Sequence, residues 1–199
     1  MKKLPRAFYS RSALRVAKDT LGKILIRRIG LTTLSGKIVE VEAYLDKKDP
    51  ASHAYRGKTR RNEVMFGKGG HLYVYFTYGM HFCANVVTGK KDVGEAVLIR
   101  AIEPLEGFEV MKRNRRFTAD RRDERNLTNG PAKLCEALGI KREDNGTDLR
   151  GDNIFLIEGK SIPKSGIGAS TRIGITRGIE KKWRFFLKGN KWVSQRIKK

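Results

Sequence analysis

Apolar residues alternate or recur at helical spacing in short stretches along the whole chain, and polar segments containing glycine separate them. Leu14, Ala17 and Leu21 share one face of a helix that Gly22 would end, while alternating β-branched residues indicate strands. These patterns predict helices over 10–21, from about Pro104 onward and over 131–138, and strands over 24–28, 37–44, 71–78, 82–87, 96–102, 154–157, 172–176 and 184–187. The first two strands are expected to be antiparallel neighbours joined by the polar stretch 30–36.

Three segments between or within these elements differ in character. Residues 46–70 are polar and contain Pro50, which indicates a long loop able to close a site. The turn at Gly79 makes 71–87 a hairpin, and the large side chains of Tyr78 and Met80 at its tip are poorly placed for burial. The segment 112–125 carries six arginines without apolar periodicity and is predicted to be a surface loop that contacts phosphates.

The length of 199 residues fits one domain, or at most two. The mixture of strands and short helices predicts an α/β mixed (α+β) fold in a single domain over 1–199. We find no internal repeat and no low-complexity linker.

Charge points to a polyanionic partner. Lys and Arg number 43 against 21 Asp and Glu, which leaves a net charge of +22. Such an excess favours nucleic acid binding, because phosphate contacts release condensed counterions. A ribosome-associated protein, or merely a soluble basic surface, would carry the same charge.

Cysteine content and hydropathy indicate the compartment. Cys83 and Cys135 are too few for a disulfide framework, and neither a signal peptide nor a membrane-spanning run is evident. We therefore expect a soluble protein of a reducing cytoplasm or nucleus.

The strand 37–44 carries candidate chemistry. Side chains alternate along it, so Glu40, Glu42 and Tyr44 share one face and the apolar residues between them occupy the other. Carboxylates on a central strand are costly unless paired or solvated, which favours a functional role. The alternative is a wet sheet face on which both glutamates lie beside lysines.

The hairpin is unusually aromatic, and Tyr73 and Tyr75 share one of its faces. These rings could stack on nucleic acid bases, or they could belong to a core strand with satisfied hydroxyls. His53, His71, His81 and Cys83 lack the spacing of a zinc site, so no metal is expected, and Cys83 is interpreted as a core residue.

Eight motifs in order carry a resemblance that runs from about residue 10 to the C-terminus. They are Ile38-Val-Glu-Val-Glu-Ala-Tyr44, Asp49-Pro-Ala-Ser-His53, Arg61-Asn62, Met65-Phe66, Tyr73-Val-Tyr75, Tyr78-Gly-Met80, Leu98-Ile-Arg-Ala-Ile-Glu-Pro104 and Asn129-Gly-Pro-Ala-Lys-Leu-Cys135. Together they resemble the alkyladenine (3-methyladenine) DNA glycosylase family. The resemblance implies a curved antiparallel sheet with flanking helices and a projecting β-hairpin.

The same resemblance implies roles for two residues in the chemistry. Glu42 matches the general base that activates water, and Arg100 matches the basic residue that helps hold Glu42 and the water. A carboxylate there can also stabilise the oxocarbenium character that develops as a purine departs. Simple binding of a phosphate at a strand edge is the alternative role for Arg100.

Further matches imply how a damaged base would be held. Tyr44, His53 and Tyr75 match the walls of a pocket for a flipped base, and Asn85 matches a floor residue that obstructs the amino group of guanine. The resemblance also assigns Tyr78 to a wedge that enters the minor groove, with Met80 beside it.

Two residues depart from the family pattern. Arg60 stands where proline is frequent, and Ala84 is smaller than the usual residue before the pocket asparagine. They bear on loop rigidity and substrate preference rather than on the reaction.

The expected function is therefore that of a monofunctional, monomeric glycosylase without metal or organic cofactor. It would hydrolyse the N-glycosidic bond of 3-methyladenine, 7-methylguanine, hypoxanthine and ethenoadenine in double-stranded DNA, at the nucleoid of a bacterium or in a eukaryotic nucleus. The alternative is a non-catalytic protein that binds structured nucleic acid through the basic segment and the aromatic hairpin.

Overall fold

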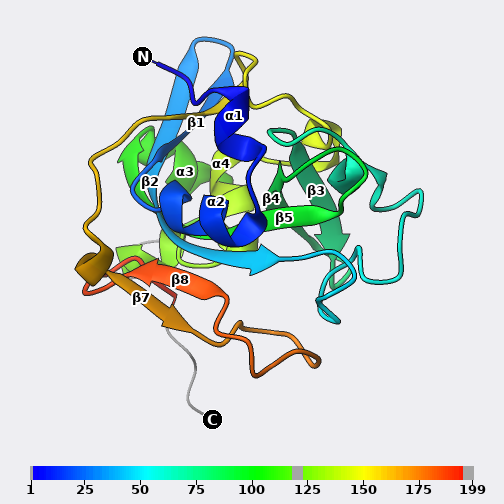
Figure 1. Ribbon diagram of the computed structural model, residues 1–199. Coiled ribbons are helices and arrows are strands. Elements are labelled where there is room, and N and C mark those ends of the chain that lie inside the picture. Colours follow the sequence, from blue (N-terminus) through cyan, green and yellow to red (C-terminus); the bar gives the residue numbers. More distant parts are fainter. Residues whose placement is uncertain (1, 118–122, 195–199) are drawn as a thin grey trace.

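The long strand β2 (Thr32–Tyr44) organises the fold, since it pairs with three other strands. The computed structural model describes residues 2–117 and 123–194 (Figure 1). Along most of its length β2 pairs with β5 (Glu95–Glu106); on its other side its first half pairs with β1 (Ile24–Ile29) and its second half with β8 (Arg184–Leu187). The second half of β2 is thus enclosed between β5 and β8.

The remaining strands extend this sheet in both directions. Its path is β3-β4-β5-β2-β1-β6, with β8 joining β2 to β7, and every pairing is antiparallel. The bounds are Leu72–Thr77 for β3, His81–Thr88 for β4, Ile154–Ile157 for β6 and Ile167–Ser170 for β7. This curled antiparallel sheet with its helices confirms the predicted mixed α/β class.

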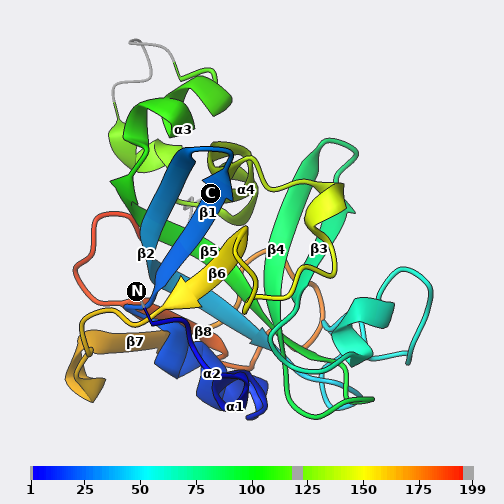
Figure 2. The same cartoon turned by 90° about the horizontal axis from the view of Figure 1, so that it is seen from above.

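Short helices cover the sheet. α2 (Ala13–Thr20) packs against β2 and β5, α4 (Pro131–Leu138) packs against β4 and β5, and α1 (Arg6–Tyr9) precedes α2. α3 (Phe108–Asn114) packs against α4, and Figure 2 shows the two on the opposite side of the molecule from α1 and α2. Single 3-10 turns lie at Glu63–Phe66, Glu124–Leu127, Arg142–Asp144 and Lys164–Gly166. No helix in the described ranges is long and apolar enough to cross a membrane.

Most elements predicted from the pattern are confirmed. α2 lies within the expected helix 10–21, α4 and β6 match their predicted bounds, and the hairpin 71–87 is β3 and β4. The polar segment 46–70 is a loop except for one 3-10 turn. α1 was not predicted, because four residues carry too little periodicity to mark a helix.

Three predictions about elements are wrong. Pro104 does not begin a helix: it lies in β5 opposite Gly36, at a register shift, and α3 begins only after Gly107 in the left-handed conformation (φ 79°). The stretch 30–36 is not a loop, since β2 already begins at Thr32. No strand covers 172–176, and β7 lies earlier in the chain.

The basic segment 112–125 is only partly the predicted surface loop. Residues 112–114 belong to α3, and residues 118–122, which include Arg121 and Arg122, lie outside the described part of the chain. Arg113 and Arg116 are exposed, whereas Arg115 pairs with a glutamate of α4 at 2.5 Å.

A buried ion pair fixes the segment that crosses beside β3. Asp144 accepts from Arg27 of β1 at 2.7 Å through Oδ1 and from the backbone N–H of Lys141 at 2.9 Å through Oδ2. We expect Asp144→Asn to lower the free energy of unfolding by roughly 1–3 kcal/mol, because it leaves the largely buried guanidinium of Arg27 without its anion. Urea unfolding measures this change. As the control, Asp152→Asn breaks the exposed ion pair with Lys3 and should leave the midpoint urea concentration of unfolding unchanged.

Candidate active site

Two glutamates of β2 lie inside the protein. Glu40 and Glu42 are both 0% exposed, with β5 on one side of the strand and β8 on the other. The β2–β5 register shifts between Ile38 and Val41, so a bulge adjoins Glu40. This burial rules out the solvated sheet face that the sequence left open for both carboxylates.

Glu42 has three donors or cations around its carboxylate. Its Oε1 accepts from the backbone N–H of Ile173 at 2.8 Å and lies 3.2 Å from Nη1 of Arg100. Its Oε2 accepts from the hydroxyl of Tyr44 at 2.8 Å. These contacts hold the carboxylate between a backbone donor, a hydroxyl and a guanidinium.

Arg100 lies between the two carboxylates. It is 6% exposed on β5, a strand with neighbours on both sides, so it is not at a strand edge where a phosphate could bind. Its Nε donates to Glu40 at 2.9 Å. Burial acts to lower the pKa of Arg100, but Glu42 and Glu40 raise it above its ordinary value, so the guanidinium stays charged.

A cavity of about 370 Å³ lies beside this charged cluster. Aromatic rings, Arg100 and the Ile173 loop line it, whereas Glu42 lies directly behind its partners. The lining residues are Tyr44, Ala51, His53, Arg61, Met65, Tyr73, Tyr75, Thr77, Tyr78, Cys83, Asn85, Leu98, Arg100, Pro131, Ile173, Gly174 and Ile175. The predicted pocket residues, which are far apart in sequence, therefore surround one space.

One wall of the cavity is an aromatic group of three residues. The ring of His53 lies edge-on to Tyr75, with centroids 4.5 Å apart, and its Nδ1 is 2.9 Å from the hydroxyl of Tyr73. Burial raises the pKa of Tyr73 to about 12 and also raises that of Tyr75. Tyr73 thus packs as a core residue with a partner for its hydroxyl, as one of the two alternatives expects, and Tyr75 packs against the same cluster. Both rings also line the cavity, and their stacking on a base stays a prediction.

β4 contributes Cys83 and Asn85 to the lining of the cavity. Asn85 is buried, and its amide donates to the carbonyl of Tyr73 at 3.1 Å, which fixes the side chain. Ala84 next to it belongs to the hydrophobic core. Cys83 is buried as predicted, yet it also lines the cavity, and burial raises the pKa of its thiol, so the thiol stays protonated.

The hairpin tip holds two strongly exposed apolar side chains beside the cavity. Tyr78 is 82% exposed and Met80 is 69% exposed, on either side of Gly79. Tyr78 adopts a left-handed backbone (φ 51°), which is strained for a residue with a side chain, and it also borders the cavity. The prediction that these residues stand out from the sheet is confirmed.

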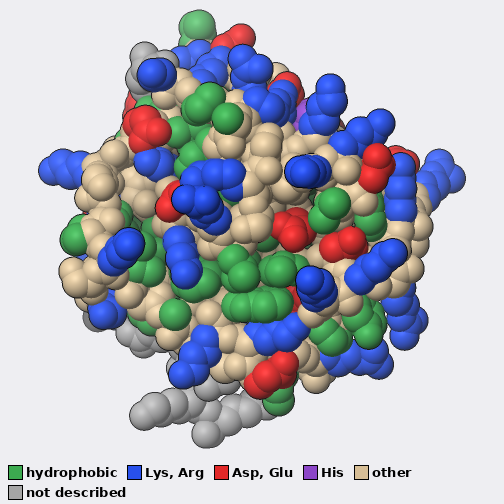
Figure 3. Space-filling view, in the orientation of Figure 1, with side chains coloured by type: hydrophobic (Ala, Val, Ile, Leu, Met, Phe, Trp, Pro, Cys, Tyr) green, Lys and Arg blue, Asp and Glu red, His purple; other side chains and the backbone are tan. Residues whose placement is uncertain are grey.

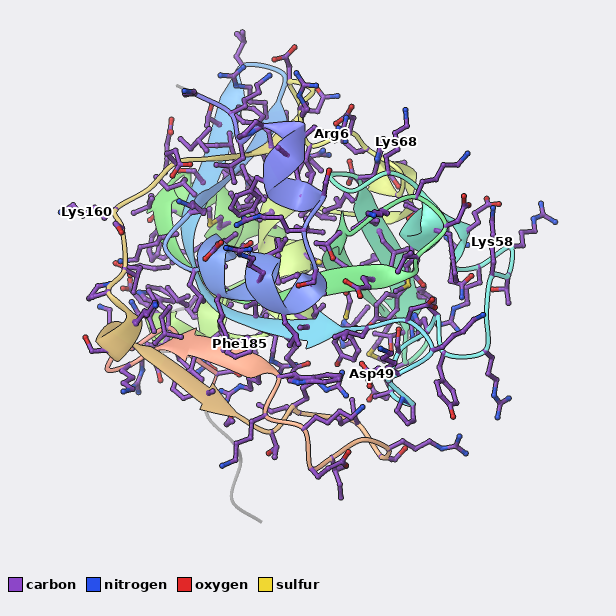
Figure 4. The ribbon with its side chains drawn as sticks, in the orientation of Figure 1. Arg6, Asp49, Lys58, Lys68, Lys160 and Phe185 are labelled. Atoms are coloured by element: carbon purple, nitrogen blue, oxygen red, sulfur yellow. The ribbon has the colours of Figure 1, made fainter. Side chains whose placement is uncertain are left out.

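A buried ion pair that sequence reasoning missed joins the two loops around the cavity. Arg172 donates to both oxygens of Asp49 at 2.6 and 2.7 Å, and its guanidinium lies 4.6 Å from the ring centroid of Tyr44. Figure 4 places Asp49 near the end of β2, where the first loop starts. Asp49 stood in a recognised motif, but nothing in the pattern marked Arg172 as its partner, because the contact spans more than a hundred residues.

The described residues offer no candidate metal site. Within 2–117 and 123–194, no group of three or more His, Cys, Asp or Glu side chains could hold an ion. The groups at the cavity include the carboxylate of Glu42 behind its wall, the guanidinium of Arg100 and the aromatic rings.

Comparison with known proteins extends over nearly the whole chain. A family model described as methylpurine-DNA glycosylase (MPG) matches residues 7–191. A “Putative 3-methyladenine DNA glycosylase” of Carboxydothermus hydrogenoformans is 52% identical over 194 residues, which cover 97% of this chain and 99% of the relative. Proteins of the same name from Clostridium acetobutylicum (49% identical; 96% and 97% covered) and Methanoculleus marisnigri (48%; 97% and 99%) are also similar. The resemblance seen in the motifs is confirmed.

The protonation of His53 gives a test of the cavity wall. Desolvation among the tyrosines, aided by the charge of Arg61, lowers the pKa of His53 below 6.5. The folded state thus binds this proton less tightly than the unfolded chain, and His53 costs stability as the pH falls below 6.5. An NMR titration, with His53→Gln to assign the signal, should show the low pKa, and Arg61→Gln should raise it. A pKa at or above 6.5 in the wild type would contradict this account of the wall.

Proposed function

Because this chain belongs to the methylpurine-DNA glycosylase family, we propose that it excises damaged purines from double-stranded DNA by hydrolysing the N-glycosidic bond. The observation that carries the proposal is the position of the Glu42 carboxylate. Arg100, Tyr44 and the N–H of Ile173 hold it, and these three residues line the aromatic cavity. The substrates we propose are 3-methyladenine, 7-methylguanine, hypoxanthine and ethenoadenine.

Glu42 is the proposed general base. A water beside Arg100 would give its proton to the carboxylate and attack the sugar carbon as the base departs, and the same negative charge would stabilise the positive sugar. Glu42 lies behind the cavity wall, so a small adjustment of its partners must bring it within reach of that water. Hydrogen bonds between a general base and the water it activates commonly reach their short length only in the substrate complex.

The cavity suits a single flipped base. Its volume of about 370 Å³ lies near the lower end of the range for small-molecule sites. The rings of Tyr44 and Tyr75 offer π faces to an electron-poor purine, and neutral His53 leaves one ring nitrogen for a hydrogen bond. Asn85, fixed on the floor, would obstruct the amino group of normal guanine.

Base flipping requires a group that fills the emptied stack. We propose Tyr78 as the wedge in the minor groove and Met80 as its support, because both are exposed at the tip of the hairpin beside the cavity. Unstacking a paired base costs a few kcal/mol, and it costs less for a damaged or mispaired nucleotide. A damaged base therefore enters the cavity more readily than a normal one.

Two further aspects follow from the composition of the site and surface. Among the residues that the structure describes, no lysine lines the cavity, which supports a monofunctional reaction that leaves an abasic site. Lysines and arginines are spread over the face in Figure 3, and Lys58 of the first loop points outward in Figure 4, as expected for contacts with phosphates. We propose that the protein acts as a monomer of one domain over 1–199, at the chromosome.

The test of the general base is Glu42→Gln. We expect this variant to bind a duplex containing one hypoxanthine as the wild type does, but to lose about 100-fold or more of the single-turnover excision rate, because the amide cannot accept the proton. Strand breaks that appear only after alkali measure excision and identify a monofunctional enzyme. If the wild type binds such duplexes and yields no abasic sites on them or on methylated DNA, the protein is a non-catalytic nucleic acid binder.

The test of the wedge is Tyr78→Ala. Removing the ring should slow excision from a paired duplex by roughly tenfold, because the flipped state loses the side chain that occupies the stack. The same lesion in single-stranded DNA, where no stack must be filled, should be excised at nearly the wild-type rate. Equal slowing on both substrates would contradict the role of a wedge.

A further inference from the structure

A second buried carboxylate lies close to the proposed general base, and the reaction described above does not use it. Glu40 precedes Glu42 by two residues on the same face of β2, and both carboxylates contact the one guanidinium of Arg100. Glu40 does not line the cavity. Any effect of Glu40 on the reaction therefore passes through its neighbours.

Every oxygen of Glu40 is occupied by a donor. Its Oε1 accepts from Nε of Arg100 at 2.9 Å, from Nε of Arg184 at 2.6 Å and from the hydroxyl of Ser194 at 2.7 Å. Its Oε2 accepts from the backbone N–H of Ser194 at 2.7 Å. Three of the four donors come from Arg184 and Ser194, which do not line the cavity, whereas the partners of Glu42 do. This separation from the cavity excludes Glu40 as the base.

The two carboxylates hold different nitrogens of Arg100. Glu40 binds Nε, at the base of the planar group, and Glu42 lies beside Nη1, at its end. This arrangement fixes the plane of the guanidinium and limits Glu42 to contact with one nitrogen. Without Glu40, Arg100 would be free to turn and engage Glu42 through two nitrogens, the geometry that guanidinium and carboxylate prefer. Glu42 would then have less capacity left for water.

The segment that follows β8 is part of this arrangement. Arg184 also donates to the carbonyl of Ser194 at 2.9 Å, and it lies in β8, which pairs with β2 at Glu40 and Glu42. Glu40 is thus held from the side opposite Arg100 by Arg184 and Ser194, neither of which lines the cavity. Its position is determined independently of any substrate.

We propose that Glu40 is the positioning residue of this site: it orients Arg100 so that the carboxylate of Glu42 keeps a lone pair for the attacking water. The inference rests on the proposed function, because it assigns Glu40 a part in the same hydrolysis. Glu40 itself touches neither the base nor the water.

The first measurement compares Glu40→Gln with the wild type in single-turnover excision of hypoxanthine and in binding of the same duplex. We expect the excision rate to fall by roughly 10- to 100-fold, the effect of misplacing a catalytic group, while Kd changes less than about twofold. Asp144→Asn is the matched control, since it breaks a buried ion pair of β1 away from the cavity. It should lose stability and keep the excision rate of the folded protein.

A double-mutant cycle shows whether Glu40 acts through Arg100. Arg100→Lys removes the Nε that Glu40 holds, so adding Glu40→Gln to this variant should slow excision by less than about twofold further. Glu40→Asp keeps the charge on a shorter side chain and should recover part of the rate. If Glu40→Gln does not fold, Glu40→Asp replaces it in the cycle with a smaller expected loss of about threefold or more.

The outcomes separate this inference from the proposed function. Excision by the wild type, together with a folded Glu40 variant that stays within twofold of it, overturns the inference alone. Full slowing by the Glu40 change in the Arg100→Lys background also overturns it, because the effect would then not pass through Arg100. A wild type that excises none of the proposed bases overturns the proposed function, and this inference falls with it.

Discussion

Compensation of buried charge is the constraint on which the rest of this structure depends. A carboxylate removed from water costs several kcal/mol unless cations and hydrogen bonds replace the solvent. β2 buries two of them, and the strands on either side each supply an arginine, Arg100 from β5 and Arg184 from β8. Two negative and two positive charges leave this cluster formally neutral in a protein of net charge +22. The strand order that encloses β2 is therefore also the order that makes its glutamates tolerable.

The same rule extends from the sheet to the loops around the cavity. Asp49 and Arg172 have no exposed side-chain surface, and they come from the two loops that border the cavity. Their bidentate pair fixes both loops, and the guanidinium lies over the ring of Tyr44. Tyr44 in turn donates to Glu42. One continuous set of contacts thus joins the aromatic wall to the carboxylate, so a change in the loops is expected to reach the carboxylate.

What could be predicted from sequence is what local periodicity determines. The alternation in β2 placed Glu40, Glu42 and Tyr44 on one face, and the turn at Gly79 marked the hairpin and its exposed tip. Local rules failed where tertiary pairing overrode them. Pro104 reads as a helix start, yet it fits a strand because its missing N–H coincides with a register shift opposite Gly36. The partners of the carboxylates, Arg172, Arg184 and Ser194, were not predicted, because charge pairs across the fold leave no periodic signal in the sequence.

The contrast between the cavity and the hairpin tip bears on how one damaged base is selected. The cavity walls are largely held in place: His53 and Asn85 are bound to Tyr73, and Tyr44 is bound to Glu42 behind the wall. A preformed site loses little conformational entropy on binding, so a base that fits gains most of the contact energy. The hairpin tip, in contrast, is not held by such contacts. Tyr78 is exposed there in a backbone conformation that costs about 1–3 kcal/mol, and the contacts with DNA that we propose would offset this cost. In the function we propose, selection would divide into two steps: the tip would respond to how easily a nucleotide leaves the stack, and the preformed cavity to the shape and charge of the base. Neither step alone would need to distinguish a damaged purine from every normal one.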